Sequence, residues 1–505
     1  MSSSNPAPLP SVSIVIPTVN NLELLIKCLR SVKALTYPSD KLEVLVVDNA
    51  STDGTPDSLG RAFPSVTCLS METNTGFAPA CNAGAARASG DYVAFLNDDA
   101  IPDTGWIEAL LSGLDAGGEG AVCAASKILS ADGEHTEYSG ASSNLFGVGR
   151  PRPLWGWPDD EEPGRGSNVL FASGGAMLVH RRTFLDVGGF DPEYFAYFED
   201  VDLGWRLWLL GHRVVYAPDA VVSHVGGATG RRSGMHKRQT LWECNSLATV
   251  LKNYEGGAME RVFSAGLMLL YKRALLAGGH AINRRDYSLT GPKDTNNANV
   301  EVLPRQSVAH LAAIDRFNTL LPHFMEMRRK VQARRTRSDA EILGLLGRLW
   351  EPQFAGEEYA WTSRQIANWL DALGLPGQYR PRVLIISSLE HMHEAASAAA
   401  HLAEHVRVAL VTLSSTRSFQ PAGAGSPFTQ HNMPADNDGV HDLVNMADSI
   451  IAFGVPHAVL RDAGCRIALA GSVPESVPEG AGGYGFVAGG DMEALLTFCL
   501  GSKRL

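Results

Sequence analysis

Apolar residues of the first hundred positions gather in short, nearly continuous runs separated by amphipathic segments. The runs SVSIVIP (11–17), LEVLVVD (42–48) and DYVAFLN (91–97) have the length and composition of buried strands. Residues 20–35, with apolar positions at three- and four-residue spacing, and residues 79–88 are expected to be helices. Such alternation is typical of a parallel sheet covered by helices on both faces.

The pattern changes after about residue 166. The segment NVLFASGGAMLVHRRTF (168–184) predicts two short strands around a glycine pair. A helix is expected from about Asp200 to Leu210, closed by Gly211 and followed by the strand RVVYAP. Residues 239–348 are predicted to be mostly helical, with a polar loop at 291–301.

The last part of the chain returns to strand-like runs. RPRVLIISS, RVALVTL, SIIAFG and RIALAG predict strands, and an alanine-rich helix is expected from about His393 to His405. We therefore predict three parts: an α/β domain over 1–255, a helical region over 256–375 and a small Rossmann-like α/β unit over 376–505.

Composition narrows the class of protein. A chain of 505 residues with 45% apolar and 19% charged residues is typical of a soluble protein with two or three domains. Its net charge of -11 argues against general nucleic-acid binding, which requires a basic surface. The seven cysteines lack CxxC spacing, which indicates free thiols in a reducing compartment.

The sequence contains no segment typical of secretion or of membrane insertion. The N-terminus lacks a basic and then apolar signal pattern. The longest apolar stretch, FSAGLMLLYKRALLAGG, is interrupted by Lys272 and Arg273. We expect a cytoplasmic protein, at most attached peripherally to the inner face of the plasma membrane.

Polar groups follow the predicted strands at the positions where those strands end. FLNDDAIPD places Asp98 and Asp99 there, and Asp48 and Thr18 end the other two strands. A polar turn that caps the next helix would explain an isolated acidic pair. Parallel strands, however, bring all four residues to the sheet edge where ligands bind, and a carboxylate there can accept the imide N–H of uracil or thymine.

The segment METNTGFAPACNAG adds amides near a helix start. Asn74, Gly76 and Asn82 lie just before or within its first turns. Side-chain amides and free backbone N–H groups at such a place can contact a base, ribose or phosphate.

Taken in order, seven segments resemble the motifs of a known family. They are IPTVNN, VVDNASTDG, NTGFAPACNAG, ASGDYVAFLNDDA, SGGAMLV, GGFDPEYFAYFEDVDLGWRLWLLGHRVVYAP and SHVGG. Their content and order are similar to inverting family 2 glycosyltransferases, particularly the rhamnosyltransferase-like branch of bacterial polysaccharide biosynthesis. The resemblance covers about Ser11 to Tyr254 and implies the GT-A nucleotide-diphospho-sugar transferase fold for this part.

The resemblance implies a divalent cation, Mg²⁺ or Mn²⁺, that bridges the donor's diphosphate at the acidic strand end. Here the motif reads Asn97-Asp98-Asp99, with an amide in the first position. Asp99 is then the expected metal ligand, and Asp98 contacts ribose or metal-bound water. His224 matches the family's third metal-side group, although a lone histidine is commonly structural. An imidazole ligand mildly favours manganese.

The resemblance also implies a catalytic base in FEDVDLGWR. Glu199, Asp200 and Asp202 lie at a helix N-terminus, where capping alone would explain some of them. By the family's motif Asp200 is the base, Glu199 is the alternative, and Asp202 is a supporting or capping residue. Trp205 either stacks on an acceptor sugar or packs in the core.

The expected donor-binding residues share positions at strand ends, helix starts or close backbone approaches. They are Pro17, Thr18, Asp48, Asn74, Asn82, Asp98, Gly174 and Gly175. The glycine pair would let the backbone approach the donor sugar, although a tight turn also explains it. A basic loop with Arg231, Arg232 and Lys237 either folds over the diphosphate or is merely solvated.

Outside the resemblance, two regions have open roles. LLPHFMEMRRKVQARRTR (320–337) combines apolar stretches with six basic residues, which suits either an anionic lipid surface or packing on the catalytic domain. The C-terminal α/β unit has no GxGxxG and no P-loop, and we expect a role in acceptor recognition or assembly.

The sequence thus predicts a metal-dependent, inverting glycosyltransferase of cell-surface polysaccharide synthesis. The donor would be a dTDP- or UDP-sugar, with rhamnose suggested by the branch, and the acceptor a glycan or a lipid-linked saccharide. One alternative is a degenerate, non-catalytic module that binds glycan or partner proteins. Another is a nucleotidyltransferase, which would be expected to carry a glycine-rich basic loop where this chain has IPTVNNLELL.

Overall fold

The computed structural model describes twelve stretches of the chain. They are residues 8–134, 136–151, 162–225, 235–277, 304–346, 382–403, 407–413, 418–420, 429–433, 449–453, 466–470 and 484–487. They belong to two compact units, one formed by 1–153 with 162–349 and the other by 154–161 with 350–505. Each unit is described by itself.

The first half of the sheet in the first unit is parallel, as predicted. In sheet order its strands are β3 (Thr67–Ser70), β2 (Leu42–Asp48), β1 (Val12–Thr18) and β4 (Tyr92–Leu96). They are connected by the helices α1 (Leu22–Lys33), α2 (Thr55–Ala62) and α3 (Phe77–Arg87). β1 is buried along its whole length, which explains its nearly continuous apolar sequence. Thr18 lies beside Asp48 in the register, so both side chains reach the carboxyl edge.

The second half of this sheet is mixed, so the parallel arrangement predicted from the first hundred residues does not continue into it. β10 (Ala176–His180) lies antiparallel between β4 and β6 (Ala121–Ser130). It starts just after the Gly174–Gly175 pair at the carboxyl edge and must therefore run away from that edge. Only the second of the two strands predicted around this pair forms, because Asn168 and Phe171 make isolated bridges instead.

The remaining strands extend the sheet beyond β6. β11 (Arg213–His224) runs parallel to β6, and β5 (Ala100–Pro102) pairs antiparallel with β11 at the edge. The predicted strand RVVYAP forms the first half of β11, which continues past an irregularity near Ala217 and carries His224 to the carboxyl edge. The smaller strands and helices of this part are β7 (Thr136–Ser139), β8 (Ala141–Ser143), β9 (Gly149–Pro151), α4 (Trp106–Gly117), α5 (Arg181–Asp186) and the 3₁₀ turn η2 (Pro192–Tyr194).

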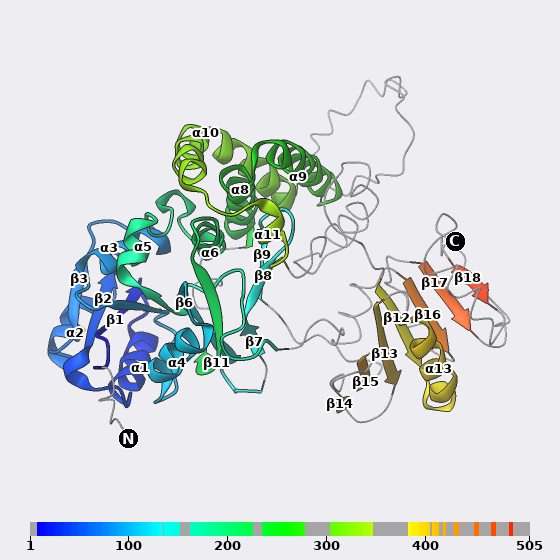
Figure 1. Cartoon of the computed structure of the whole chain (residues 1–505), viewed down its shortest axis with the longest axis horizontal. Coiled ribbons are helices and arrows are strands. Elements are labelled where there is room, and N and C mark those ends of the chain that lie inside the picture. The colour runs from blue at the N-terminus through cyan, green and yellow to red at the C-terminus, as the bar shows by residue number, and fades with distance from the viewer. Residues whose placement is uncertain are drawn as a thin grey trace, which may run out of the picture. The chain divides into compact units, whose positions relative to one another are not determined.

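Helices complete the first unit. The predicted helix after residue 199 is α6 (Glu199–Leu209). It is followed by α8 (Met235–Asn253), α9 (Gly256–Ala277), α10 (Arg305–Arg334) and α11 (Asp339–Leu343). α8 packs on α6, and α9 and α10 pack on α8 and on each other, as Figure 1 shows. The polar loop predicted at 291–301 lies outside the described residues.

A buried ionic network ties these helices together. Lys252 on α8 is fully buried, and its Nζ lies 2.6 Å from Asp191 Oδ2 and 2.9 Å from Asp202 Oδ1. Arg206 on α6 donates from Nε to Asp202 at 2.8 Å, and His323 Nε2 on α10 lies 2.8 Å from Asp191 Oδ1. The network joins the turn before α6, α6, α8 and α10, so these elements share one set of buried charges.

The basic cluster at the end of α10 is used mainly within the protein. Arg328 donates to the carbonyls of Leu251 and Tyr254, and Arg334 pairs with Asp186. In the same way Arg335 pairs with Asp339, and Arg337 donates to the carbonyls of Trp208, Gly211 and His212. Arg329 and Lys330 are exposed and pair with Glu326. These contacts favour packing within the first unit over lipid contact as the explanation of the cluster.

The second unit contains a sheet of seven strands. In order they are β14 (Ser418–Gln420), β15 (Thr429–Met433), β13 (Arg407–Leu413), β12 (Arg382–Ser387), β16 (Ser449–Phe453), β17 (Arg466–Ala470) and β18 (Tyr484–Val487). All pairs are parallel except the edge strand β14. Without β14 the order is that of a Rossmann sheet, as predicted. Helix α13 (Met392–Leu402) buries its alanines against β12, β13 and β16.

Within the stretches that the structure describes, no helix combines the length and the apolar character that crossing a bilayer requires.

Candidate active site

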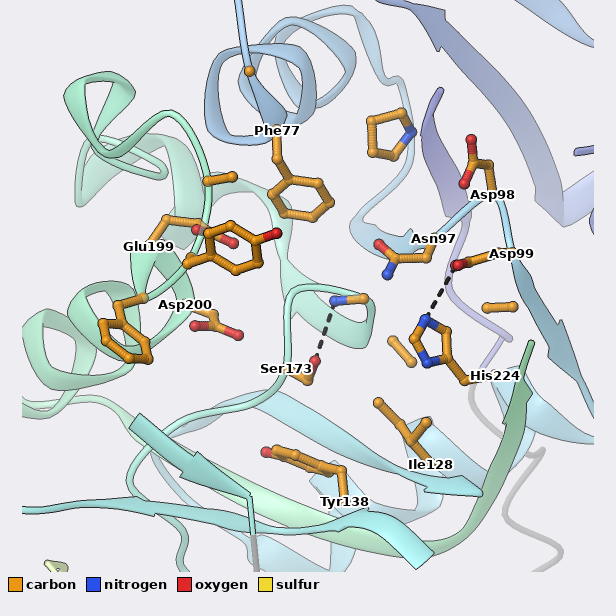
Figure 2. Close-up of a pocket in the computed structure, with 18 of the residues that line it drawn as sticks. Phe77, Asn97, Asp98, Asp99, Ile128, Tyr138, Ser173, Glu199, Asp200 and His224 are labelled. Atoms are coloured by element: carbon orange, nitrogen blue, oxygen red, sulfur yellow. Dashed lines mark hydrogen bonds and ion pairs between the residues drawn. The ribbon is translucent and has the colours of Figure 1, made fainter. Parts of the chain in front are cut away.

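A pocket of about 530 Å³ opens at the carboxyl ends of β1 and β4 and is bordered by the segment that enters α6. Figure 2 shows Asp99 and His224 on one side of it and Glu199 and Asp200 on the other. Its size is in the range of sites that hold small molecules. The predicted site residues that line it are Pro17, Thr18, Asn74, Asp98, Asp99, Gly175, Glu199, Asp200 and His224.

The two adjacent aspartates of the strand end have different partners. Asp98 accepts hydrogen bonds from Thr18 Oγ1 at 2.7 Å and from Asn21 Nδ2 at 3.0 Å. Its side chain therefore points away from His224, whereas that of Asp99 points toward it (Figure 2). The bond to Thr18 joins the ends of β1 and β4.

Asp99 and His224 form a close pair. The distance from His224 Nε2 to Asp99 Oδ1 is 3.1 Å, and His224 Nδ1 lies 2.9 Å from Glu137 Oε2. Burial opposes the charged imidazole, but the hydrogen bonds and charges of both carboxylates outweigh it and raise the pKa of His224 to about 10. Glu137, on β7, fixes the ring orientation and leaves Nε2 facing Asp99 and the pocket.

The residues here fit a cation that keeps open coordination positions. One carboxylate and one imidazole nitrogen converge, and no group of three histidine, cysteine or acidic residues in the described part of the chain is arranged to hold a metal by itself. Mg²⁺ and Mn²⁺ in nucleotide sites take several ligands from phosphate and water, so two protein ligands are adequate.

Two carboxyl groups face the pocket from the start of α6. Asp200 accepts hydrogen bonds from the backbone N–H of Gly174 at 3.1 Å and of Val201 at 2.8 Å. Burial raises the pKa of Asp200 to about 6, although these N–H groups favour its ionised form. Glu199 is 5% exposed, and its Oε2 has no hydrogen-bond partner within the described structure. Burial and then the charge of Asp200 raise the pKa of Glu199 well above its ordinary value.

These surroundings assign different states to the two groups. The raised pKa of Glu199 favours its protonated form beside an ionised Asp200, because two like charges so close together in a buried place are unfavourable.

The segment that enters α6 has a strained backbone. Phe195, Tyr197 and Phe198 have φ values of 61°, 70° and 64°, in the left-handed region that bulky residues rarely adopt. Each such residue costs of the order of 1–3 kcal/mol and persists only where its surroundings hold it. The aromatic residues that line the pocket are Phe77, Tyr138, Phe171, Phe195, Tyr197 and Phe198.

Comparison with known proteins decides the family. The family model described as glycosyl transferase family 2 matches residues 13–188. The chain is 34% identical over 219 residues to the N-acetylglucosaminyl-diphospho-decaprenol L-rhamnosyltransferase of Mycobacterium tuberculosis. The matched region covers 39% of this chain and 70% of that protein. The chain belongs to glycosyltransferase family 2. The predicted family is thereby confirmed, as is the α/β class of its catalytic part.

Of two further matches, one is shorter and the other has a lower sequence identity. Glycosyltransferase AglE of Haloferax volcanii is 39% identical over 113 residues, which is 22% of this chain and 37% of that protein. A solved structure of GalNAc-T7 with UDP, GalNAc and Mn²⁺ superposes with a TM-score of 0.42 at 17% identity and covers 51% of each chain.

Not every residue predicted for the donor site of this family 2 glycosyltransferase reaches the pocket. Asn82 uses both ends of its amide on the backbone of Phe190, at 2.7 and 2.9 Å. Asp48 is 2% exposed and accepts from the N–H of Ser51, whereas its neighbour Asn49 lines the pocket. Gly174 acts through its N–H on Asp200 rather than as a lining residue.

Other predicted residues of the glycosyltransferase have structural places. Trp205 is fully buried against the ring of Tyr254, at 5.2 Å, which confirms its core alternative. Asp202 belongs to the buried ionic network. Lys237 is exposed on α8, while its neighbour Arg238 lines the pocket. Arg231 and Arg232 lie outside the described residues.

Sequence reasoning missed two lining residues with side chains that matter to the chemistry. Glu137 lies in TEYS, a short strand with no recognisable motif, and Arg238 was passed over for Lys237. Lys237 and Arg238 are consecutive residues, and a helix over 235–253 directs consecutive side chains to different faces. The helical periodicity of this segment could therefore have separated Arg238 from Lys237.

Proposed function

We propose that this family 2 glycosyltransferase transfers a sugar from a nucleoside diphosphate donor with inversion at the anomeric carbon, to a glycan or lipid-linked saccharide. The observation that carries the proposal is one pocket with the Asp99–His224 pair on one wall and Asp200 on the other. The name of the mycobacterial relative, a rhamnosyltransferase with a decaprenol-linked acceptor, supports rhamnose and a lipid-linked acceptor. A dTDP- or UDP-sugar is the proposed donor.

The nucleoside would lie toward the ends of β1 and β2. Asn49 donates from Nδ2 to Asn74 Oδ1 at 3.1 Å and to the carbonyl of Gly76 at 3.0 Å, so these groups border the pocket as one hydrogen-bonded set. Asp98, oriented by Thr18 and Asn21, is placed to accept from ribose hydroxyls.

Asp99 and His224 Nε2 would hold a divalent cation, Mn²⁺ or Mg²⁺, beside the diphosphate, and the cation would displace the proton that Nε2 carries in the metal-free protein. When bound, the cation offsets the negative charge that grows on the leaving nucleoside diphosphate. The imidazole ligand favours Mn²⁺.

Asp200 is the proposed general base. As the acceptor oxygen forms its bond to the anomeric carbon, the bond to the diphosphate breaks on the opposite side and the hydroxyl proton passes to Asp200. A single displacement of this kind inverts the configuration. A carboxyl with a pKa of about 6 is ionised at neutral pH and is more basic than an ordinary aspartate. Burial and the charge of Asp200 raise the pKa of Glu199 well above its ordinary value, which disfavours the ionised form that a base requires.

A lipid-linked acceptor would place the reaction at the inner face of the plasma membrane. The protein would meet that surface peripherally, since no described helix could span a bilayer. The internal contacts of Arg328, Arg334, Arg335 and Arg337 make these four residues poor candidates for lipid binding.

A thermal-shift panel of nucleotide sugars, with and without Mn²⁺, tests the proposal. Ligands that bind the folded state raise its melting temperature. We expect one donor to stabilise the wild type only with Mn²⁺, and Asp99→Ala to lose this shift. Asp57→Ala, at an exposed acid on α2, is the matched control and should keep it.

Transfer to a saccharide acceptor, followed by NMR of the product linkage, then tests inversion. If no donor stabilised the wild type under any condition, the result would favour a non-catalytic binding module over an enzyme. Stabilisation by nucleotide sugars in the absence of metal, unchanged in Asp99→Ala, would refute the metal site alone.

A further inference from the structure

The loop from Tyr194 to Phe198 has a conformation that needs outside support. The N–H of Ala196 donates to the carbonyl of Tyr194 at 2.7 Å, which closes a tight turn centred on Phe195 with φ 61° and ψ −62°. This form of γ-turn is rare and strained. Tyr197 and Phe198 follow in the left-handed region, and Asp200 comes two residues later.

One side chain holds this loop from another element. Asn245, on α8, is fully buried, and its Nδ2 lies 3.1 Å from the carbonyl oxygen of Tyr194, 3.0 Å from that of Ala196 and 2.7 Å from that of Tyr197. The two hydrogens of one amide group thus serve three carbonyl groups of the strained turn. These three carbonyl groups lie outside the α-helices and strands, so they lack the regular backbone hydrogen bonds of those elements.

The neighbouring turns of α8 contact the same loop. Trp242, one turn before Asn245, meets the ring of Tyr197 edge-on at 5.8 Å. Thr249, one turn after Asn245, bonds through Oγ1 to the hydroxyl of Tyr194 at 2.8 Å. Positions 242, 245 and 249 lie on one face of a helix, so a single face of α8 contacts the whole loop.

The loop in turn connects both sides of the pocket. The carbonyl of Phe195 accepts the N–H of Ala78 at the start of α3, and the carbonyl of Phe198 accepts the N–H of Asp202 in the first turn of α6. Gly76 has φ 97°, and a Cβ there would lie 2.5 Å from the Phe195 carbonyl oxygen. The path of this loop therefore fixes where the first turn of α6 presents Asp200.

We propose that Asn245 is a positioning residue for the transfer reaction. Its amide holds the 194–198 loop in the conformation that places Asp200 and the aromatic side chains of this loop against the substrate. The inference rests on the proposed function. It extends the catalytic machinery to α8, which lies beyond residues 13–188 matched by the family model.

The chemistry of the contact sets the choice of variant. Three carbonyl oxygens require a donor, so Asn245→Asp keeps the shape and replaces the donor with an acceptor. Asn245→Ala removes the group with little added repulsion. Ser246→Ala is the control, because Ser246 is buried beside Asn245 on the same helix and its Oγ donates to the carbonyl of Glu243 in its own helix.

The test separates positioning from general stability by measuring donor binding and turnover on the same full-length variants. We expect Asn245→Asp to lower kcat for transfer about 100-fold, since a displacement of about 1 Å at a reacting group has that effect. The thermal shift produced by donor with Mn²⁺ should stay as in the wild type, because Asp98, Asp99 and His224 are held by contacts with one another, with Thr18, with Asn21 and with Glu137, none of which is on α8. Ser246→Ala should keep wild-type kcat.

Hydrogen exchange of the peptide containing residues 194–200 supplies a readout independent of catalysis. It should speed up in Asn245→Asp and not in Ser246→Ala, even if the protein transferred no sugar, so failure of the proposed function and of this inference are distinguishable. Wild-type kcat and exchange in Asn245→Asp would overturn the proposal. If Asn245→Asp failed to fold, Asn245→Ala would decide by the same measurements, and failure of both to fold would make Asn245 a folding residue instead.

Discussion

Glu199 and Asp200 are adjacent carboxyl groups with different surroundings. Two backbone N–H groups favour the ionised form of Asp200, whereas Glu199 has an unpaired oxygen in a buried place. The sequence placed both at a helix start but could not rank them by geometry, because their hydrogen-bond partners include Gly174 on a distant segment. The structure supplies the difference that the motif alone left open.

Neutral substitutions should therefore affect the two positions unequally. We expect Asp200→Asn to lower kcat by about 10²- to 10⁴-fold, the usual contribution of a general base. Glu199→Gln should lower kcat less than about tenfold, because an uncharged amide of the same shape replaces a carboxyl whose raised pKa favours its uncharged form. Steady-state kinetics at pH 7.5 would compare the two variants. A larger loss in Glu199→Gln than in Asp200→Asn would reverse the assignment.

The pKa of Asp200 predicts both an activity profile and a stability effect. The rate should fall as the pH drops through about 6, where Asp200 takes up its proton. Because its pKa is raised from 3.8, the folded state binds this proton more tightly than the unfolded chain, and that stabilisation is lost as the pH rises from about 4 to 6.

Between pH 4 and pH 7 the stability of Asp200→Asn should consequently rise relative to that of the wild type, by about 1 kcal/mol for a partly exposed group. Thermal melting of both proteins at pH 4 and pH 7 checks the sign of this change. An acid limb near pH 4 in the rate profile would contradict the raised pKa.

At the scale of elements, the strands with nearly continuous apolar sequence were predictable and those with mixed sequence were not. β1, β2 and β4 were recognised because both faces are buried. β6 and the helix before it gave no prediction, since AVCAASKILS alternates small, polar and apolar residues without a clear period. The antiparallel direction of β10 depends on the glycine turn before it, which a strand pattern cannot reveal.

The buried ionic network is the element-scale feature with the largest expected cost on mutation. Lys252→Met would leave Asp191 and Asp202 without their shared cation, with Arg206 and His323 as remaining partners. Removing one partner of a buried ion pair typically destabilises a protein by about 3–5 kcal/mol.

Urea unfolding of Lys252→Met measures this loss. Lys27→Met is the control, because Lys27 is exposed and pairs only with Glu23 one turn away on α1, where a change of less than about 0.5 kcal/mol is expected. Equal stability of the two variants would mean that the network contributes little beyond packing.

At the scale of the whole molecule, the boundary predicted at residue 255 divides one compact unit. α8 to α11 belong to the same compact unit as the sheet. Arg328 on α10 donates to the carbonyl of Tyr254, just after α8, and His323 on α10 bonds to Asp191. The sequence indicated helices there but could not show which surface they cover, since contacts such as His323 to Asp191 join residues 132 positions apart. The Rossmann-like unit, in contrast, was recognisable from its own strands.

Shortened chains test this division. A chain ended after residue 349 should unfold cooperatively and keep the thermal shift with donor and Mn²⁺, whereas a chain ended after residue 255 should lose both. The shorter chain lacks α10, which buries Phe324 against Tyr194 beside the active-site loop. Donor binding by the 255-residue chain would support the predicted boundary.

The place of α10 in the sequence also bears on how the protein is made. All strands of the first unit's sheet, the proposed base and the proposed metal ligands leave the ribosome well before His323 and Arg334. The partners of these two residues, Asp191 and Asp186, are synthesised 132 and 148 residues earlier. A nascent chain paused before α10 would expose the apolar side of α8 and leave Asp191 without one of its partners. Slowing translation just upstream of residue 305 should therefore lengthen the exposure of this surface to chaperones and proteases, while a pause late in the second unit, after α10 has left the ribosome, should not.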